Sequence, residues 1–274
     1  MLIAPALRTH TVAAPDGTRL AVREWGDPAG RPVLFIHGYS QTGLSWAHQV
    51  AAPDLAHLRL VTFDLRGHGA SDKPADPAAY QESARWGEDV AAILDQCALE
   101  RPVLAGWSYG GRIIGDYLAA SGAEKLGGLV FVDAITDNAR HFYGSCNRLM
   151  KLMTDPDPAV SIQATREFQR ACVLHDPEPD LFATLLCAAM MCPPQVRAAM
   201  GRAADYGAVL SRTNLPSLVI HGTEDQVIAP AMATHLAGLL PNARLEMMAD
   251  AGHAPFLEQP AAFNALLRDF INDL

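Results

Sequence analysis

The chain lacks the features that mark secreted, membrane-spanning and nucleic-acid-binding proteins. Its 274 residues include five cysteines, and no two of them form a C-x-x-C pair. No apolar run is long enough to cross a bilayer, and the N-terminal apolar stretch, soon interrupted by Arg8, is too short for a secretory signal. The net charge is −9, and no basic stripe is present to meet phosphates. We therefore expect a cytoplasmic protein with free, mostly buried thiols and no nucleic-acid or membrane partner.

Common cofactor and metal signatures are also missing. Neither G-x-G-x-x-G nor a P-loop follows a predicted strand, and neither H-E-x-x-H nor a paired Cys and His spacing occurs. We expect no cofactor and no metal. A chain of this length buries enough apolar surface to fold without disulfides or a metal. With nucleic acid and membranes excluded, the expected partner is a small-molecule substrate. The sequence gives no indication of the oligomeric state.

Strand and helix patterns alternate along most of the chain. Strands are predicted at 19–26, 32–38, 58–64, 101–106, 127–133, 215–222 and 243–250. Helices are predicted at 44–56, 80–98, 109–121, 230–240 and from about 260. Most of these strands are continuous apolar runs, which are typical of parallel strands buried on both faces. The order predicts an α/β fold with a doubly wound, mostly parallel sheet.

The alternation stops after the strand that ends near Asp133. From 137 to 212 only helical patterns occur, and several prolines interrupt them. We interpret 137–212 as a helical lid inserted into a core domain made of 1–136 and 213–274.

The stretch AGWSYGGR places Ser108 between a predicted buried strand and a predicted helix. A sharp strand-to-helix turn lifts such a hydroxyl clear of the backbone. The turn also crowds its neighbours, so it requires small residues two positions away on either side, here Gly106 and Gly110. The motif is short enough to occur by chance, and its interpretation therefore depends on partner residues elsewhere in the chain.

A serine hydroxyl needs a base, and His253 is the best candidate because it follows the last predicted strand. Asp225, just beyond the preceding strand, is the best carboxylate to orient it. Asp133 also ends a strand and is the rival for this role. His37 and His221 each precede a glycine at a strand end, and we interpret them as braces of loops. The order serine, acid, histidine predicts a catalytic triad at one edge of the sheet.

Two backbone N–H groups are predicted to form an oxyanion hole. The sequence FIHGYS leaves a strand through His37 and Gly38, which turns the N–H of Tyr39 toward the serine. The N–H of Tyr109 directly follows Ser108. Together they would hold the negative oxygen of a tetrahedral intermediate.

With these motifs the chain resembles the α/β-hydrolase superfamily from about residue 10 to the end, apart from the predicted lid. The stretches FDLRGHGASDKP (63–74) and GHAPFLEQP are similar to two further segments of that superfamily. The resemblance is closest to small esterases, lactonases and cofactor-free haloperoxidases. It implies Ser108 as nucleophile, His253 as base, Asp225 as acid, and the amides of Tyr39 and Tyr109 as oxyanion donors.

Residues that contact the substrate are harder to predict. Trp107 and Ser40 border the expected site. In the predicted lid, Phe142, Tyr143 and Met150 are candidates for an apolar pocket, and the lid's own packing is the competing interpretation.

These observations predict a serine hydrolase that cleaves a small carboxylic ester or lactone through an acyl-enzyme on Ser108. C–C bond hydrolases, thioesterases, perhydrolases and lyases can use the same triad and stay open as alternatives. A ligand receptor on a hydrolase scaffold is the alternative from another class. Two cation pairs could meet an anionic substrate or simply be solvated: Arg148 with Lys151, and Arg166 with Arg170.

Overall fold

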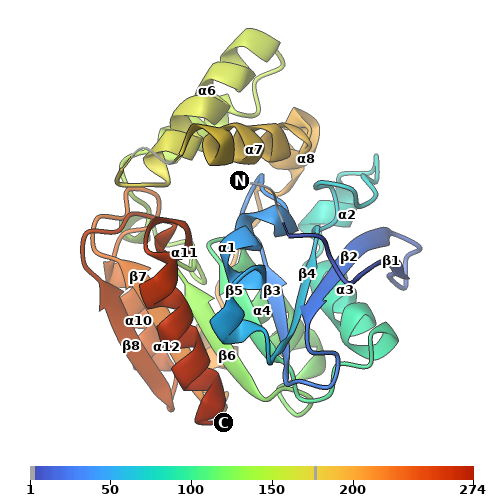
Figure 1. Cartoon of the computed structure of the whole chain (residues 1–274). Helices are drawn as coiled ribbons and strands as arrows, with labels where there is room; N and C mark the ends of the chain where they lie inside the picture. Colours follow the sequence, from blue (N-terminus) through green and yellow to red (C-terminus); the bar gives the residue numbers. More distant parts are fainter. Residues whose placement is uncertain (1–3, 176–177) are drawn as a thin grey trace.

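The computed structural model describes residues 4–175 and 178–274. An eight-stranded sheet forms its centre, with the strand order β1-β2-β4-β3-β5-β6-β7-β8 (Figure 1). The strands are β1 Arg8–Ala13, β2 Arg19–Gly26, β3 Pro32–Ile36, β4 Arg59–Phe63, β5 Val103–Trp107, β6 Gly128–Val132, β7 Ser217–Gly222 and β8 Ala243–Met248. The β1–β2 and β2–β4 pairs are antiparallel and all other pairs are parallel. The predicted mostly parallel α/β sheet is confirmed.

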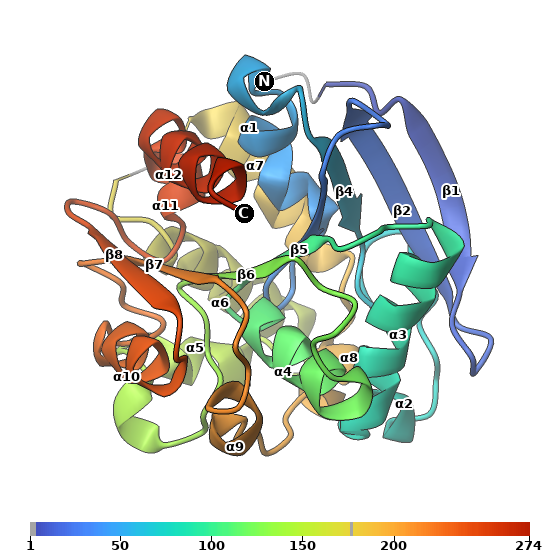
Figure 2. The ribbon, with the colours of Figure 1, turned by 90° about the horizontal axis from the view of Figure 1, so that it is seen from below.

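Alternate side chains of the central strands enter two apolar cores, one on each face of the sheet. In β3, Phe35 belongs to one core, and its neighbours Leu34 and Ile36 belong to the other. Successive side chains of a strand point to opposite faces, so a strand covered on both faces is apolar at every position. The layers are visible in Figure 2: one face is covered by α3 Ser83–Gln96, α4 Gly110–Ser121 and α10 Ala231–Leu239, and the other by α1 Ala47–Val50 and α12 Pro260–Asn272.

Three elements differ from the prediction. The predicted helix at 44–56 is three short pieces, η1 Gly43–Trp46, α1 and η2 Pro53–Leu55, and Pro53 begins the last of them because it has no N–H to continue a helix. The predicted helix at 80–98 is divided into α2 Ala78–Gln81 and α3, with extended backbone at Glu82 between them. Strand β1 was not predicted, because it lies at the sheet edge and is mostly exposed.

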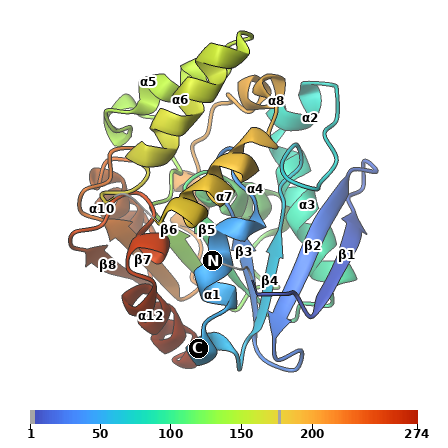
Figure 3. The same cartoon turned by 45° about the horizontal axis from the view of Figure 1, so that its top comes forward.

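Residues 137–212, called the inserted segment below, contain no named strand in their described part. Their helices are η3 Arg140–Phe142, α5 Asn147–Leu152, α6 Pro158–Ala171, α7 Pro179–Met190, α8 Pro194–Ala199 and α9 Gly207–Leu210. A proline is the first residue of α6, α7 and α8, where its missing N–H costs nothing. The prolines that interrupt the pattern therefore mark helix starts. Figure 1 shows α6, α7 and α8 lying above the edge of the sheet at which β3, β5 and β6 end, and Figure 3 shows α5 beside α6.

All five cysteines are free, and four of them are buried while Cys187 is exposed. This agrees with the expected free thiols. Among the residues that the structure describes, no helix has both the length and the apolar character needed to cross a membrane.

Candidate active site

Ser108 lies at the turn between β5 and α4 and has a φ of 55°. This left-handed conformation costs a non-glycine residue on the order of 1 kcal/mol or more. Three backbone hydrogen bonds hold it: Ser108 N donates to Val132 O at 2.9 Å, and Ser108 O accepts from Gly111 N at 3.0 Å and from Ile135 N at 3.1 Å. The turn is therefore stabilised by strand β6 and by the chain that follows it.

The glycines around Ser108 are required by close backbone approach. A Cβ at Gly106 would lie 2.6 Å from Gly110 O, and a Cβ at Gly110 would lie 2.7 Å from Ile36 O. Both distances are shorter than a carbon atom tolerates, and backbone oxygens in buried strands and turns cannot move away cheaply. The predicted steric need for small residues at both positions is confirmed.

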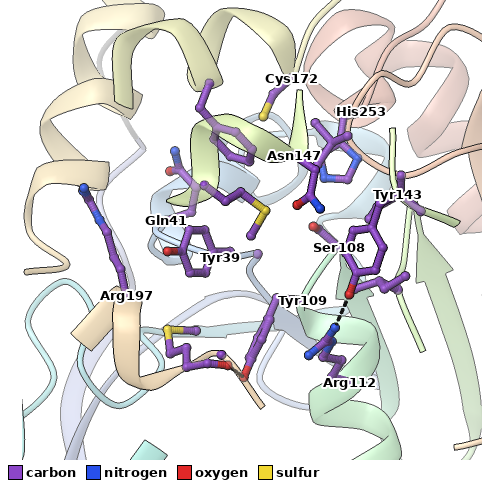
Figure 4. A pocket seen from close by; sticks show the side chains of 18 of the residues that line it. Tyr39, Gln41, Ser108, Tyr109, Arg112, Tyr143, Asn147, Cys172, Arg197 and His253 are labelled. Carbon is purple, nitrogen blue, oxygen red and sulfur yellow. Dashed lines mark hydrogen bonds between the residues drawn. The ribbon is translucent and has the colours of Figure 1, made fainter. Parts of the chain in front are cut away.

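His253 and Asp225 meet beside this turn. The His253 Nδ1 atom lies 2.7 Å from Asp225 Oδ2, and both side chains are buried. The other oxygen of Asp225 accepts from Val227 N at 2.7 Å and Ile228 N at 3.0 Å. Burial raises the pKa of Asp225, but the nearby imidazoles and their hydrogen bonds outweigh this and hold the pKa well below its usual value. Figure 4 shows His253 and Ser108 at the same end of a pocket.

The loop that carries His253 is fixed by two side chains. Trp107 Nε1 donates to His253 O at 2.7 Å, and the two rings lie 5.5 Å apart. Glu258 Oε1 accepts from Gly252 N at 2.8 Å, and its Oε2 accepts from Leu174 N at 2.6 Å. Trp107 therefore lies at the site, as expected, and also holds the histidine loop in place.

Asp133, the rival acid, lies close behind this pair. It is fully buried, its Oδ1 accepts from Gly222 N at 2.9 Å, and it makes no hydrogen bond to His253 in the described chain. Ligand atoms of Asp133, Asp225 and His253 lie within 4.8 Å of one another, and so do those of His10, Glu24 and Cys97 elsewhere in the molecule. Both groups contain metal-ligating residue types, which spacing in the sequence did not indicate.

The histidines interpreted as braces differ in their surroundings. His37 donates from Nδ1 to Gly38 O at 2.8 Å and accepts at Nε2 from Leu65 N at 2.9 Å, and burial lowers its pKa to about 4. It is a neutral loop brace. His221 instead lies 3.2 Å from the carboxylate of Asp225, so the description of it as a loop brace is incomplete.

The two predicted oxyanion donors lie next to the serine. Tyr109 is the N-cap of α4, and neither its N–H nor that of Tyr39 donates to another group in the described parts of the chain. A Cβ on Gly38, the residue before Tyr39, would lie 3.1 Å from Ser108 Cβ. Tyr109 thus adjoins the serine in the chain, Tyr39 follows a glycine that packs on it, and both amides are available to a ligand.

A cavity of about 590 Å³ opens beside Ser108 and His253 (Figure 4). Trp107, Tyr143 and Met150 line it, as the sequence suggested. Ser40 and Phe142 do not line it: the hydroxyl of Ser40 donates to Ala189 O at 3.1 Å, and Phe142 packs on the ring of His235 at 4.9 Å. Their side chains are taken up by these buried contacts.

Several polar residues of the cavity wall were not predicted. They are Gln41, Arg112, Asn138, Asn147, Gln169, Arg197 and Arg202. Only Arg112 carried a usable signal, because it lies in the first turn of α4, directly after the turn that holds Ser108. The others reach the wall from segments whose tertiary placement the sequence pattern does not reveal.

Comparison with known proteins identifies the family of the chain. The profile of the alpha/beta hydrolase family matches residues 33–266. A provisionally named aryl esterase from Burkholderia cenocepacia is 38% identical, with a TM-score of 0.94 over 97% of this chain and 98% of that chain. An esterase from Rhodococcus sp. ECU1013 is 36% identical, with a TM-score of 0.92 over 97% of this chain and 99% of that chain. A non-heme chloroperoxidase of Streptomyces lividans is 27% identical, covering 95% of this chain and 99% of that protein. With a family match that spans most of its length, the chain belongs to the alpha/beta hydrolase family.

Proposed function

We propose that the protein is a serine hydrolase that cleaves a small carboxylic ester or lactone. One observation carries the proposal: the 2.7 Å contact between His253 Nδ1 and Asp225 Oδ2, beside a strained serine at the wall of a cavity. An imidazole held at Nδ1 presents its other nitrogen as a base. The similar esterases from Burkholderia and Rhodococcus support an ester as substrate.

In the proposed mechanism His253 Nε2 removes the proton of Ser108 Oγ as that oxygen bonds to the substrate carbonyl carbon. The carbonyl oxygen becomes an oxyanion and accepts from the N–H groups of Tyr39 and Tyr109, each worth about 3 kcal/mol in the transition state. The C–O bond to the alcohol then breaks, and His253 gives its proton to the departing oxygen. The product of this step is an acyl-Ser108.

Water completes the cycle. His253 removes a proton from water, the hydroxide adds to the acyl carbon, and the bond to Ser108 Oγ breaks as that oxygen regains the proton. An ester gives an acid and an alcohol, and a lactone gives one hydroxy acid. We also propose that the inserted segment acts as the lid, because its residues Tyr143, Met150 and Arg197 face the core residues across the cavity.

The test is turnover of p-nitrophenyl acetate together with labelling by a fluorophosphonate. Ser108→Ala should abolish labelling and lower kcat by about 10³-fold or more, whereas Ser211→Ala, at an exposed serine, should change neither. Rapid turnover that survives Ser108→Ala contradicts the proposal. A wild-type protein that neither labels nor turns over esters is the result expected of a ligand receptor.

A further inference from the structure

The cavity is cationic although the protein is acidic. No aspartate or glutamate is among its lining residues in the described chain, whereas the whole chain has a net charge of −9. The cationic lining residues are Arg112, Lys151, Arg197 and Arg202. Of these four cations, only Arg202 has a carboxylate partner within the described part of the chain, namely Asp116. The other cations leave a positive potential in a space that water shares with substrate.

The fold itself explains the position of Arg197. Its side chain is buried, and its N–H groups donate to Met153 O at 3.1 Å and to Ala189 O at 2.7 Å. These carbonyls lie at the C-terminal ends of α5 and α7, where unpaired oxygens and the helix dipole favour a cation. Arg197 therefore joins two helices and needs no anion.

Arg112 has no such explanation. It is the third residue of α4, near the positive end of the helix dipole, where a cation is disfavoured. It is 6% exposed, and within residues 4–175 and 178–274 its guanidinium donates only to uncharged oxygens: Arg202 O at 3.0 Å, Asn138 Oδ1 at 2.5 Å and Tyr143 Oη at 2.6 Å. Figure 4 shows this contact with Tyr143 on the cavity wall near Ser108. A buried guanidinium at a helix N-terminus without a counter-ion is unfavourable for folding.

We infer that the cavity takes esters or lactones that carry an additional carboxylate, and that Arg112 selects them. A carboxylate bound on this side of the cavity would supply the missing negative charge to Arg112 and to the N-terminus of α4. Lys151, which reaches the cavity from α5, would add to the attraction. The inference rests on the proposed ester hydrolysis and assigns Arg112 as a specificity-determining residue. Arg148, which belongs to the same helix α5 as Lys151, is exposed and does not line the cavity.

The kinetic experiment uses substrate pairs that differ only by a carboxylate and its uncharged amide. Monoethyl adipate and the ethyl ester of adipamic acid place the charge on the acid side, and 4-acetoxybenzoate and 4-acetoxybenzamide place it on the alcohol side. We expect kcat/KM to favour the carboxylate by about tenfold or more in at least one pair. Arg112→Gln should remove most of this preference, Arg112→Lys should retain part of it, and Arg148→Gln, with the same change in net charge, should leave it unaltered.

A binding measurement separates this inference from the proposed function. Titration calorimetry with adipate and with adipamide, on wild type and Arg112→Gln, requires no turnover. Adipate binding by wild type that is weakened in the variant supports the inference even if no ester is hydrolysed. If esters are hydrolysed without preference for a carboxylate in either pair, or if Arg112→Gln keeps the preference, the inference is wrong while the proposed hydrolysis stands. If adipate binds no better than adipamide and no ester is turned over, both fail.

Discussion

His221 Nε2 lies 3.2 Å from Asp225 Oδ2, the oxygen that also contacts His253 Nδ1 at 2.7 Å. The same nitrogen of His221 lies 3.7 Å from Asp133 Oδ1. The proposed catalytic acid is thus held by two imidazoles, and a second buried carboxylate lies beside one of them. Burial lowers the pKa of His221, but the carboxylates of Asp133 and Asp225 outweigh it and raise the pKa to about 9. Burial and the charge of Asp225 raise the pKa of Asp133 well above its usual value, so His221 lies between an ionised carboxylate and a carboxyl group that holds its proton more tightly.

We predict that this arrangement makes stability fall in mild alkali. The pKa of His221 is raised from 6.5 in the unfolded chain to about 9, so its stabilisation is complete below pH 6.5 and is lost as the pH rises toward 9. The slope should approach about 1.4 kcal/mol per pH unit. The free energy of unfolding in urea between pH 6 and pH 9.5 measures it. The double variant His221→Gln with Asp133→Asn removes the titrating imidazole and should flatten this slope. An unchanged slope would mean that His221 is not the group that titrates.

The two aspartates should differ in their effect on catalysis. Only Asp225 contacts His253, so Asp225→Asn should lower kcat for p-nitrophenyl acetate by about 10³-fold or more. Asp133→Asn should lower it by less than about tenfold, because the amide can still accept from Gly222 N. The two variants serve as controls for each other. If Asp133→Asn is as damaging as Asp225→Asn while the protein stays folded, Asp133 is the catalytic acid.

A methyl group at Gly110 should destabilise the turn. The added Cβ would lie 2.7 Å from Ile36 O, which is part of a central strand, so the strand or the helix must move. We expect Gly110→Ala to lower the free energy of unfolding by about 2 kcal/mol and also to reduce kcat. Gly238→Ala is the matched control: it lies in α10, the added Cβ would meet no atom within 4 Å beyond its chain neighbours and its own helix backbone, and the change should raise stability by about 0.5–1 kcal/mol. Equal effects at both sites would contradict the role of close packing.

Two buried histidines should make the protein less stable in mild acid, at pH values above those at which ordinary carboxyl groups titrate. Burial lowers the pKa of His37 to about 4 and that of His68 to about 3, while each titrates at 6.5 in the unfolded chain. The unfolded state therefore binds more protons, and stability falls as the pH drops from 6.5 toward 4, by up to about 1.4 kcal/mol per unit for each histidine. Denaturant unfolding across this range measures the slope. His37→Gln should reduce it, and His57→Gln, at an exposed surface residue, should not. Equal slopes for the wild type and His37→Gln would overturn the prediction.

Much of the site could be predicted because the relevant spacing is local. The glycines around Ser108 and the position of Asp225 and His253 after strands follow from steric rules and from the direction of a parallel sheet. The bridging role of His221 could not be predicted in this way. It depends on the ends of β6 and β7 lying side by side, which places Asp133 and Asp225 around one imidazole.

The residues that line the cavity could also be predicted only in part. Met150 and Tyr143 were predicted to line it and do so, whereas Phe142, next in sequence to Tyr143, packs away from it on His235. A short helix such as η3 offers no clear period, so adjacent residues cannot be assigned to a face from the pattern alone.

The amino-acid sequence alone determined the α/β class and the strand-to-helix turn at Ser108, because each depends on residues close together in the chain. It also showed that Asp225 and His253 each follow a predicted strand. Only the tertiary structure decided what surrounds them. The imidazole between two carboxylates and the unpaired cation of Arg112 on the cavity wall arise from contacts across long sequence separations. Such contacts depend on how the elements pack, and no local pattern records them.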